Sequence, residues 1–468
     1  MLFSSLIFIF LFLTVTLFVN NVLLRKSLLL QNIFLTLASL FFYAWGEPFN
    51  ILLMLGSIAL NWLSALWVSR LKAKGSRLAL PVLIVCLLLN FGALFYFKYL
   101  NFSLSLLNRA FGASLESLAV EMPIGISFFT FQAVSYVVDV YRQKEDAHKN
   151  PLYVAFYISF FPQLIAGPIV RYSDISQQIQ SRALSFDGFA AGVKRFLTGL
   201  ARKVLLSNVV GAIADRAFAL DCPSPAMAWL GAIAYAFQIY YDFSGYSDMA
   251  IGLGLMFGIR IPENFNHPYT SSTVKDFWRR WHMTLSVWFR DYVYIPLGGN
   301  RSPSAARRVL NLLAVWALTG LWHGANMTFL VWGLWYFVLL SAERALGLSN
   351  KNTWYTHLYT LFFVLIGWVI FRAPSLSAAG QYIGAMFGLG TPGIEAPSVL
   401  VLLKENWFTL LMALLFATRL PSSVLKRLQE KHPVAHEAIT CTALLLMFVL
   451  SLAHLINGTY NPFIYFNF

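Results

Sequence analysis

The sequence predicts an all-α polytopic membrane protein, and three observations carry that prediction. Of the 468 residues, 58% are hydrophobic and 12% are Asp, Glu, Lys or Arg, and the mean hydropathy is +0.65. A soluble protein of this composition would leave far too much apolar surface in contact with water. Apolar stretches long enough to cross a bilayer recur along the chain, and basic residues gather between them. We therefore expect roughly 11–13 transmembrane or re-entrant helices.

The first 120 residues are expected to form peripheral membrane spans. Residues 1–19 are apolar but lack a basic start and a small-residue cleavage site, so they predict a retained first span rather than a signal peptide. Basic residues follow the first, third and fifth predicted spans: Arg25, Lys26, Arg70, Lys72, Lys74, Arg77, Arg142, Lys144 and Lys149. Because short cytoplasmic loops carry the excess of Lys and Arg, the N-terminus should lie outside.

Three patterns mark the middle of the chain. Residues 160–168 interrupt an apolar stretch with two prolines and a glycine, which predicts a broken or re-entrant segment buried in protein. Residues 188–203 mix basic and apolar side chains, as an interfacial amphipathic helix does. Residues 227–259 form a long apolar run punctuated by Gly245, Gly252, Gly254 and Gly258, whose spacing favours close packing of helices.

Residues 258–308 are rich in charged and aromatic side chains, and their basic excess predicts a cytoplasmic position. On a continuous helix, one face would be shared by Trp278, Trp281, His282, Leu285 and Phe289. This pattern predicts that His282 faces the protein. The alternative is a hydrogen-bonded core histidine beside a solvated basic face that binds lipid headgroups, and it stays open.

Residues 309–341 contain no Asp, Glu, Lys or Arg, yet they include His323. A stretch this apolar is expected in the bilayer, where an ionisable side chain is costly and marks a candidate functional site. The alternative is a histidine whose ring nitrogens bond a neighbouring helix. Beyond residue 345, we expect further membrane spans.

Two inward-facing histidines indicate acyl transfer. A neutral imidazole can accept a proton from a hydroxyl nucleophile, and a second imidazole can hold the thioester carbonyl or orient the base. The expected donor is phosphorylated, with acetyl-CoA as co-substrate, because guanidinium groups bind phosphates well. The expected donor-binding residues are Arg279, Arg280, Trp278, Arg290 and Arg301. No bound cofactor is expected, and no metal site, because the three cysteines have no paired spacing.

Several longer motifs resemble the membrane-bound O-acyltransferase family, in its bacterial alginate O-acetyltransferase-like branch. They are residues 122–132, 135–136, 139–142, 163–169, 241–249, 276–301 and 321–324. The resemblance implies that His323 is the catalytic histidine and His282 the second active-site position. It also implies a central funnel from the cytoplasm, for which we expect a lining of Trp322, Asn326 and Trp281.

The resemblance further implies a single integral membrane domain over residues 1–468. Within it, we expect peripheral spans at 1–120, a catalytic core at 121–345 and C-terminal spans at 346–468. The implied activity is O-acetylation of an exopolysaccharide such as alginate or cellulose, in a bacterial inner membrane. The expected partners are an extracytoplasmic acetyltransferase, a polysaccharide biosynthesis complex and membrane lipids, with no nucleic acid. Peptidoglycan O-acetylation, D-alanyl transfer to teichoic acid and a proton-coupled transporter or flippase remain alternatives.

Overall fold

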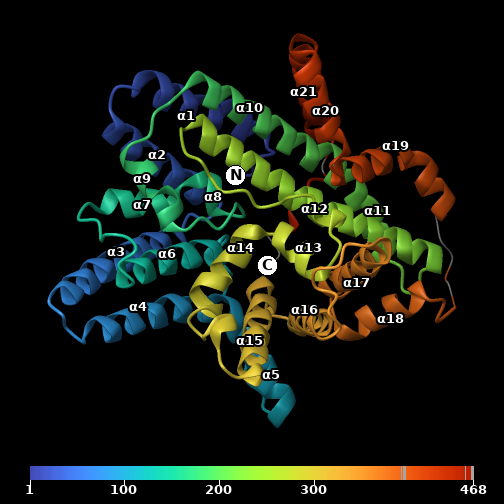
Figure 1. The fold of residues 1–468 in the computed structure, drawn as a ribbon, viewed down its shortest axis with the longest axis horizontal. Helices are drawn as coiled ribbons and strands as arrows, with labels where there is room; N and C mark the ends of the chain where they lie inside the picture. Colours follow the sequence, from blue (N-terminus) through green and yellow to red (C-terminus); the bar gives the residue numbers. More distant parts are fainter. Residues whose placement is uncertain (392, 394–396, 459, 465–468) are drawn as a thin grey trace. The chain divides into compact units, whose positions relative to one another are not determined.

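A computed structural model describes residues 1–391, 393, 397–458 and 460–464, and within them all regular secondary structure is helical (Figure 1). Six helical stretches in this part of the chain are long and apolar enough to cross a membrane. They are Ile51–Ala73, Ala79–Phe111, Phe186–Phe218, Trp354–Arg372, Val399–Ala417 and Pro433–Asn457. The predicted all-α, multi-pass membrane fold is confirmed. The last residues of the predicted C-terminal spans, 465–468, lie outside the described residues.

The chain packs as two compact units. The first contains residues 1–196 and 247–262, and the second contains residues 197–246 and 263–468. Two of the three chain boundaries between them fall inside helices, at 196/197 in α10 (Phe186–Ala201) and at 246/247 in α12 (Pro225–Met256), and the third follows residue 262. The predicted division into peripheral spans, core and C-terminal spans stays a prediction.

The first unit is built mainly from helices in the first 180 residues. They are η1 (Ile7–Leu13), α1 (Thr14–Phe18), η2 (Val19–Leu23), α2 (Leu28–Ala44), α3 (Ile51–Ala73), α4 (Ala79–Leu94), η3 (Phe95–Tyr99), α5 (Leu100–Phe111), α6 (Ile126–Tyr141), α7 (Pro151–Ser159), α8 (Phe161–Leu164) and α9 (Tyr172–Gln180). The helix breaks at Phe160, and residues 160–168 are all buried, so the predicted broken segment is confirmed.

Residues 227–259 fold largely as predicted, because a single helix, α12, runs from Pro225 to Met256. Its glycines allow a close approach to α10. A Cβ added at Gly252 would lie 2.6 Å from the carbonyl oxygen of Gly192, and one at Gly245 would lie 2.8 Å from that of Gly199. Neither position has room for a larger residue, which confirms the predicted packing role.

The interfacial interpretation of residues 188–203 is wrong at its C-terminal end. Lys203 is buried, and its ammonium lies 2.6 Å from Asp242 Oδ1 of α12. Arg195 makes a second ion pair, with Asp248, at 2.6 Å. Two of the four basic side chains of this segment therefore neutralise carboxylates on a neighbouring helix.

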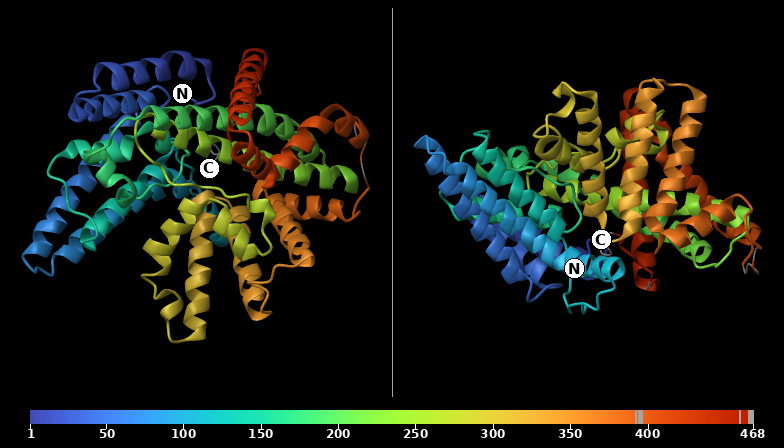
Figure 2. Two further views of the ribbon diagram at one scale, coloured as in Figure 1. Left: turned by 45° about the horizontal axis from the view of Figure 1, so that its top comes forward. Right: turned by 90° about the horizontal axis from the view of Figure 1, so that it is seen from below.

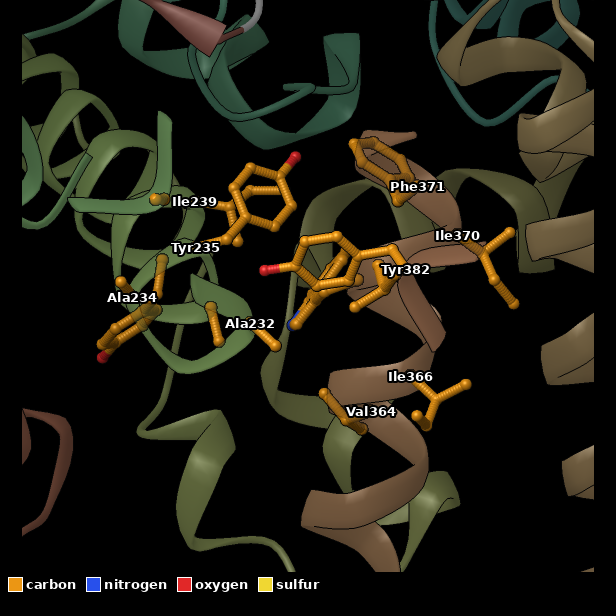
Figure 3. Close-up of a cluster of buried hydrophobic side chains, with 14 of the residues drawn as sticks. Ala232, Ala234, Tyr235, Ile239, Val364, Ile366, Ile370, Phe371 and Tyr382 are labelled. Carbon is orange, nitrogen blue, oxygen red and sulfur yellow. The ribbon is translucent and has the colours of Figure 1, made fainter. Parts of the chain in front are cut away.

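The second unit contains the remaining helices. They are η4 (Arg202–Ser207), α11 (Asn208–Phe218), η5 (Pro268–Thr270), α13 (Val274–Arg280), α14 (Met283–Phe289), η6 (Arg290–Tyr294), η7 (Gly299–Arg301), α15 (Ala305–His323), α16 (Met327–Ala345), α17 (Trp354–Arg372), α18 (Leu376–Met386), α19 (Val399–Ala417), α20 (Leu420–Lys431) and α21 (Pro433–Asn457). Figure 3 shows part of its core, where Tyr235 and Ile239 of α12 share one buried cluster with Val364 of α17 and Tyr382 of α18.

The apolar stretch 309–341 forms most of a helical hairpin made by α15 and α16. Helix α15 ends at His323, and α16 begins at Met327 after three intervening residues. The last of these, Asn326, accepts a hydrogen bond through Oδ1 from the Thr328 backbone N–H (3.2 Å). The two helices lie side by side (Figure 2), and Gly333 approaches the Trp316 carbonyl too closely for any Cβ. His323 therefore sits at a helix end beside a tight turn.

Candidate active site

His282 lies at a break between two short helices, α13 and α14. The predicted continuous helix through this position is wrong, because His282 adopts a left-handed backbone conformation with φ of 43°. Two backbone hydrogen bonds with residues 264–266 stabilise the break. Asn266 N donates to Arg280 O (2.9 Å), and Met283 N donates to Asn264 O (3.0 Å). His282 is nevertheless only 1% exposed, so the prediction that it faces the protein is confirmed.

Asn264 anchors the His282 ring. Its side-chain oxygen, Oδ1, lies 3.1 Å from His282 Nδ1. The same oxygen accepts hydrogen bonds from the Thr284 backbone N–H (3.3 Å) and the Thr284 hydroxyl (2.9 Å). The ring of Phe243, from α12, packs edge-on against the imidazole with 4.6 Å between centroids. The ring is thus fixed both by a polar anchor and by an apolar wall.

His323 ends α15 inside an aromatic enclosure. Its side chain is 3% exposed, and its ring lies 5.0 Å from that of Trp332 and 5.2 Å from that of Phe371. Trp322 connects the two histidines, because its ring lies 5.0 Å from that of His323 and 5.8 Å from that of His282. The structure therefore brings together the two histidines that the sequence singled out, although 40 residues separate them.

A cavity of about 670 Å³ opens beside His282. Four cationic residues line it, Lys275, Arg279, Arg308 and Arg344, and none of its described lining residues is acidic. The other lining residues are Trp278, His282, Leu285, Ser286, Phe289, Tyr294, Asn300, Leu312, Val315, Trp316, Thr319, Leu340, Gly347, Ser349 and Asn350. The cavity lining thus combines four cationic side chains, an apolar and aromatic wall, and one imidazole.

The predicted donor-binding residues divide into two groups. Trp278 and Arg279 line the cavity, whereas Arg280, Arg290 and Arg301 are not among its lining residues. The guanidinium of Arg280 is held by Asp276 (2.8 Å) and by the Thr270 hydroxyl (3.1 Å). Arg290 pairs with Asp291 at 2.7 Å, and Arg301 is exposed in η7.

The three residues expected to line a funnel are placed separately. Trp322 lies between the histidines, Trp281 is buried against Trp368 with 4.8 Å between ring centroids, and Asn326 caps α16 while donating to Pro374 O (3.1 Å). None of the three belongs to the described lining of the cavity.

Sequence reasoning missed Asn264 and the cations at 275, 308 and 344. Arg344 lies beyond the basic segment 258–308 altogether. Arg308 lies near the start of α15 and Arg344 near the end of α16, so the helix hairpin brings them together at its open end, away from the turn. A prediction of the turn at 324–326 would have indicated this pairing.

The electrostatics favour a neutral His282. Burial lowers the pKa of His282 well below its ordinary value, and the nearby His323 imidazole lowers it further. A histidine that stays neutral at physiological pH can accept a proton. Within the described part of the chain, no three His, Cys, Asp or Glu side chains are grouped so that they could hold a metal ion.

Comparison with known proteins places this site in a family. Residues 83–378, which include both histidines, match the membrane-bound O-acyltransferase family. The chain is 44% identical to a probable alginate O-acetylase of Pseudomonas aeruginosa over 84% of its own length and 76% of that protein. It is 39% identical to a probable alginate O-acetylase of Pseudomonas putida over 100% of both chains. It is also 37% identical to the peptidoglycan O-acetyltransferase of Helicobacter pylori, over 83% of this chain and 80% of that one. The chain therefore belongs to the membrane-bound O-acyltransferase family and is an acyltransferase.

Proposed function

We propose that this chain is a membrane O-acetyltransferase that takes acetyl from cytoplasmic acetyl-CoA and delivers it for O-acetylation of an exopolysaccharide. Alginate is the first candidate polysaccharide, since two probable alginate O-acetylases match this chain over its whole length, and cellulose is another. The proposal rests mainly on the cavity that is lined both by four cationic side chains and by His282.

The cavity has the chemistry of a coenzyme A site. Its cations can bind phosphates, and Arg279 is exposed, so its guanidinium can reach an anion at the mouth. The wall formed by Trp278, Leu285, Phe289 and Trp316 is apolar, which suits the long arm that carries the thioester. A donor bound by its phosphates would thus place its acyl end toward His282.

The chemistry at the inner end is acyl transfer between oxygen and sulfur. A hydroxyl attacks the thioester carbonyl, one imidazole takes the hydroxyl proton, and the other imidazole stabilises the carbonyl oxygen. The aromatic rings packed around His323 limit the access of water, which would otherwise hydrolyse the thioester. Family membership decides against a transporter or flippase as the primary activity.

We further propose that the protein lies in the bacterial inner membrane with its N-terminus outside and residues 258–308 in the cytoplasm. Three of the four cavity cations, Lys275, Arg279 and Arg308, belong to the basic segment that supports this orientation, so a cytoplasmic donor would meet the cavity directly. An extracytoplasmic acetyltransferase within a polysaccharide biosynthesis complex would then receive the acetyl group and pass it to the glycan.

Peptidoglycan O-acetylation is the second candidate function. The specific observation in its favour is the 37% identity to the Helicobacter pylori enzyme over most of both chains. Both candidates need the same donor chemistry and differ only in the acceptor. Measuring acetyl esters separately on isolated exopolysaccharide and on isolated peptidoglycan from a deletion strain distinguishes them, because only the true acceptor loses its esters.

Replacing Arg279 with Gln is expected to weaken binding of acetyl-CoA by roughly tenfold, since a charge-assisted hydrogen bond contributes about 1.5–3 kcal/mol and exposure reduces this value. Phosphate contacts lie far from the reacting bond, so KM should rise more than kcat falls. The measurement is a direct titration of the purified protein with acetyl-CoA, together with steady-state kinetics.

Arg307→Gln provides the matched control, because Arg307 is an exposed arginine next to Arg308 but not among the residues lining the cavity. Its donor affinity should stay normal. Arg280→Gln should have a smaller effect than Arg279→Gln, because Asp276 already engages the Arg280 guanidinium. Equal affinities for wild type and Arg279→Gln would contradict the donor site and would favour a carrier-bound donor, as D-alanyl transfer requires.

A further inference from the structure

A second cavity, of about 330 Å³, lies within the second unit and shares none of its described lining residues with the cavity beside His282. Its walls come from α11, α19, α21 and the segment that follows α21. Each of these three helices belongs to a candidate membrane span. The lining is nevertheless polar, with Asn208, Arg216, Glu405, Asn406, His454 and Tyr460 among its residues.

Two opposite charges line this cavity without pairing. Arg216 on α11 and Glu405 on α19 are both exposed, and neither forms an ion pair with a described residue. Asp215, next to Arg216, is already engaged. Its carboxylate accepts hydrogen bonds from the Arg372 guanidinium (2.5 Å) and the Tyr460 hydroxyl (2.5 Å). The Arg216 guanidinium and the Glu405 carboxylate therefore remain available to a ligand that carries both charges.

A buried hydrogen-bond acceptor lies in the same wall. Asn208 is only 7% exposed, and its Nδ2 donates to Asn461 Oδ1 (3.2 Å), whereas its Oδ1 has no hydrogen-bond partner among the described residues. Such an oxygen is costly to bury unless a ligand donates to it. Arg216 follows about two turns later on the same face of α11, and its side chain points back toward the start of that helix. One small ligand can thus reach both residues.

The surroundings of the cavity are those of a membrane surface. Arg216 and His454 lie close to the ends of their candidate spans, which end at Phe218 and Asn457. Trp407, next to the lining residue Asn406, is 61% exposed, and exposed tryptophans favour the level of the lipid headgroups. The apolar windows of α19 and α21 are only 11% buried inside the protein, so acyl chains can pack beside the cavity.

We propose that this cavity binds the headgroup of a zwitterionic phospholipid that carries a primary ammonium, of the phosphatidylethanolamine class. Arg216 binds the phosphate through charge-assisted hydrogen bonds. Glu405 pairs with the ammonium, and one ammonium N–H donates to Asn208 Oδ1. Phosphatidylglycerol offers the phosphate without a cation, so Glu405 disfavours it, and the quaternary group of phosphatidylcholine has no N–H for Asn208. The bound lipid would connect α11, α19 and α21.

Native mass spectrometry of the purified full-length protein, mixed with equimolar phosphatidylethanolamine and phosphatidylglycerol of identical acyl chains, tests this proposal. The wild-type protein should retain phosphatidylethanolamine preferentially. Glu405→Gln should reduce that preference by about fivefold, the upper range for an exposed ion pair. Arg216→Gln should weaken binding of both lipids by about tenfold, because both offer the same phosphate. Asn208→Ala should reduce the preference for phosphatidylethanolamine over phosphatidylcholine.

The matched controls are Glu430→Gln and Arg427→Gln on α20, because both residues are exposed and neither lines the cavity. They should bind both lipids as the wild type does. Equal retention of the two lipids by the wild type, or an unchanged preference in Glu405→Gln, would overturn the proposal. So would binding of an alginate oligosaccharide that depends on Arg216 while lipid binding does not, since the cavity would then be a glycan site. The measurement involves no acetyl-CoA, so its outcome is separate from that of the proposed acyl transfer.

Discussion

Replacing His323 with Ala is expected to lower acetyl transfer by ~10²–10⁴-fold, whichever of two roles the imidazole performs. A general base and a donor to the developing oxyanion both act chiefly in the transition state, so kcat should fall while donor affinity stays close to normal. The measurement is the acetyl content of the cell's polysaccharide at equal membrane abundance of the two proteins, followed by kcat of the purified enzymes.

The corresponding His282→Ala variant should lose activity to a similar extent, and the double variant should lose little more than either single one. Groups that act as one unit show such non-additivity. A His323→Ala protein that inserts normally and acetylates near the wild-type level would contradict the site. If His282→Ala instead unfolds the protein, the alternative of a merely structural core histidine is correct.

Replacing Asp242 with Ala is expected to destabilise the protein by about 3–5 kcal/mol, because it leaves the buried Lys203 ammonium without its counter-charge. The two side chains are only 3% and 1% exposed and lie 2.6 Å apart. Asp242 Oδ2 also accepts a hydrogen bond from the Ile464 backbone N–H (2.8 Å), so the same change releases the chain near its C-terminus. The measurement is the fraction of protein that stays monodisperse after heating in detergent.

The double variant Lys203→Met/Asp242→Leu serves as the control, since replacing both charges by apolar groups removes the penalty of the unpaired ion. It should recover most of the lost thermal stability. Equal stabilities for Asp242→Ala and wild type would show that the ion pair is not needed for the fold. Phe243, next to Asp242, packs on His282, so activity should be compared only between variants of equal stability.

The sequence was sufficient to predict the fold class and to single out His282 and His323 as buried histidines. Composition and the rarity of ionisable groups in apolar stretches are local signals that need no knowledge of the fold. It could not show the break at His282. That break depends on backbone hydrogen bonds with Asn264, which accepts from Met283 N, and with Asn266, which donates to Arg280 O; both lie 14 to 19 residues earlier in the chain. Helical periodicity nevertheless predicted the buried face, since the residues flanking the break keep their inward orientation.

Charge patterns were the least reliable guide. The basic residues of 188–203 fit a solvated face equally well as an ion-paired one, and only the position of Asp242 on a separate helix decides for the buried pair. The cationic lining of the cavity is likewise assembled from α13, α15 and α16. Of these residues, Arg344 lies outside the segment whose basic excess suggested a donor site. Asn326 after Gly324 is a helix start signal that would have divided the apolar run correctly.

Release of free thiol from acetyl-CoA by the purified, detergent-solubilised protein tests the central claim most directly. In the presence of a soluble hydroxyl acceptor, the wild-type enzyme should release thiol in proportion to the acetyl ester formed. The His282→Ala and His323→Ala proteins should release thiol at ~10²-fold lower rates or less. Wild-type protein that binds acetyl-CoA at the cavity and transfers no acetyl, or histidine variants that transfer acetyl at the wild-type rate, would contradict the account.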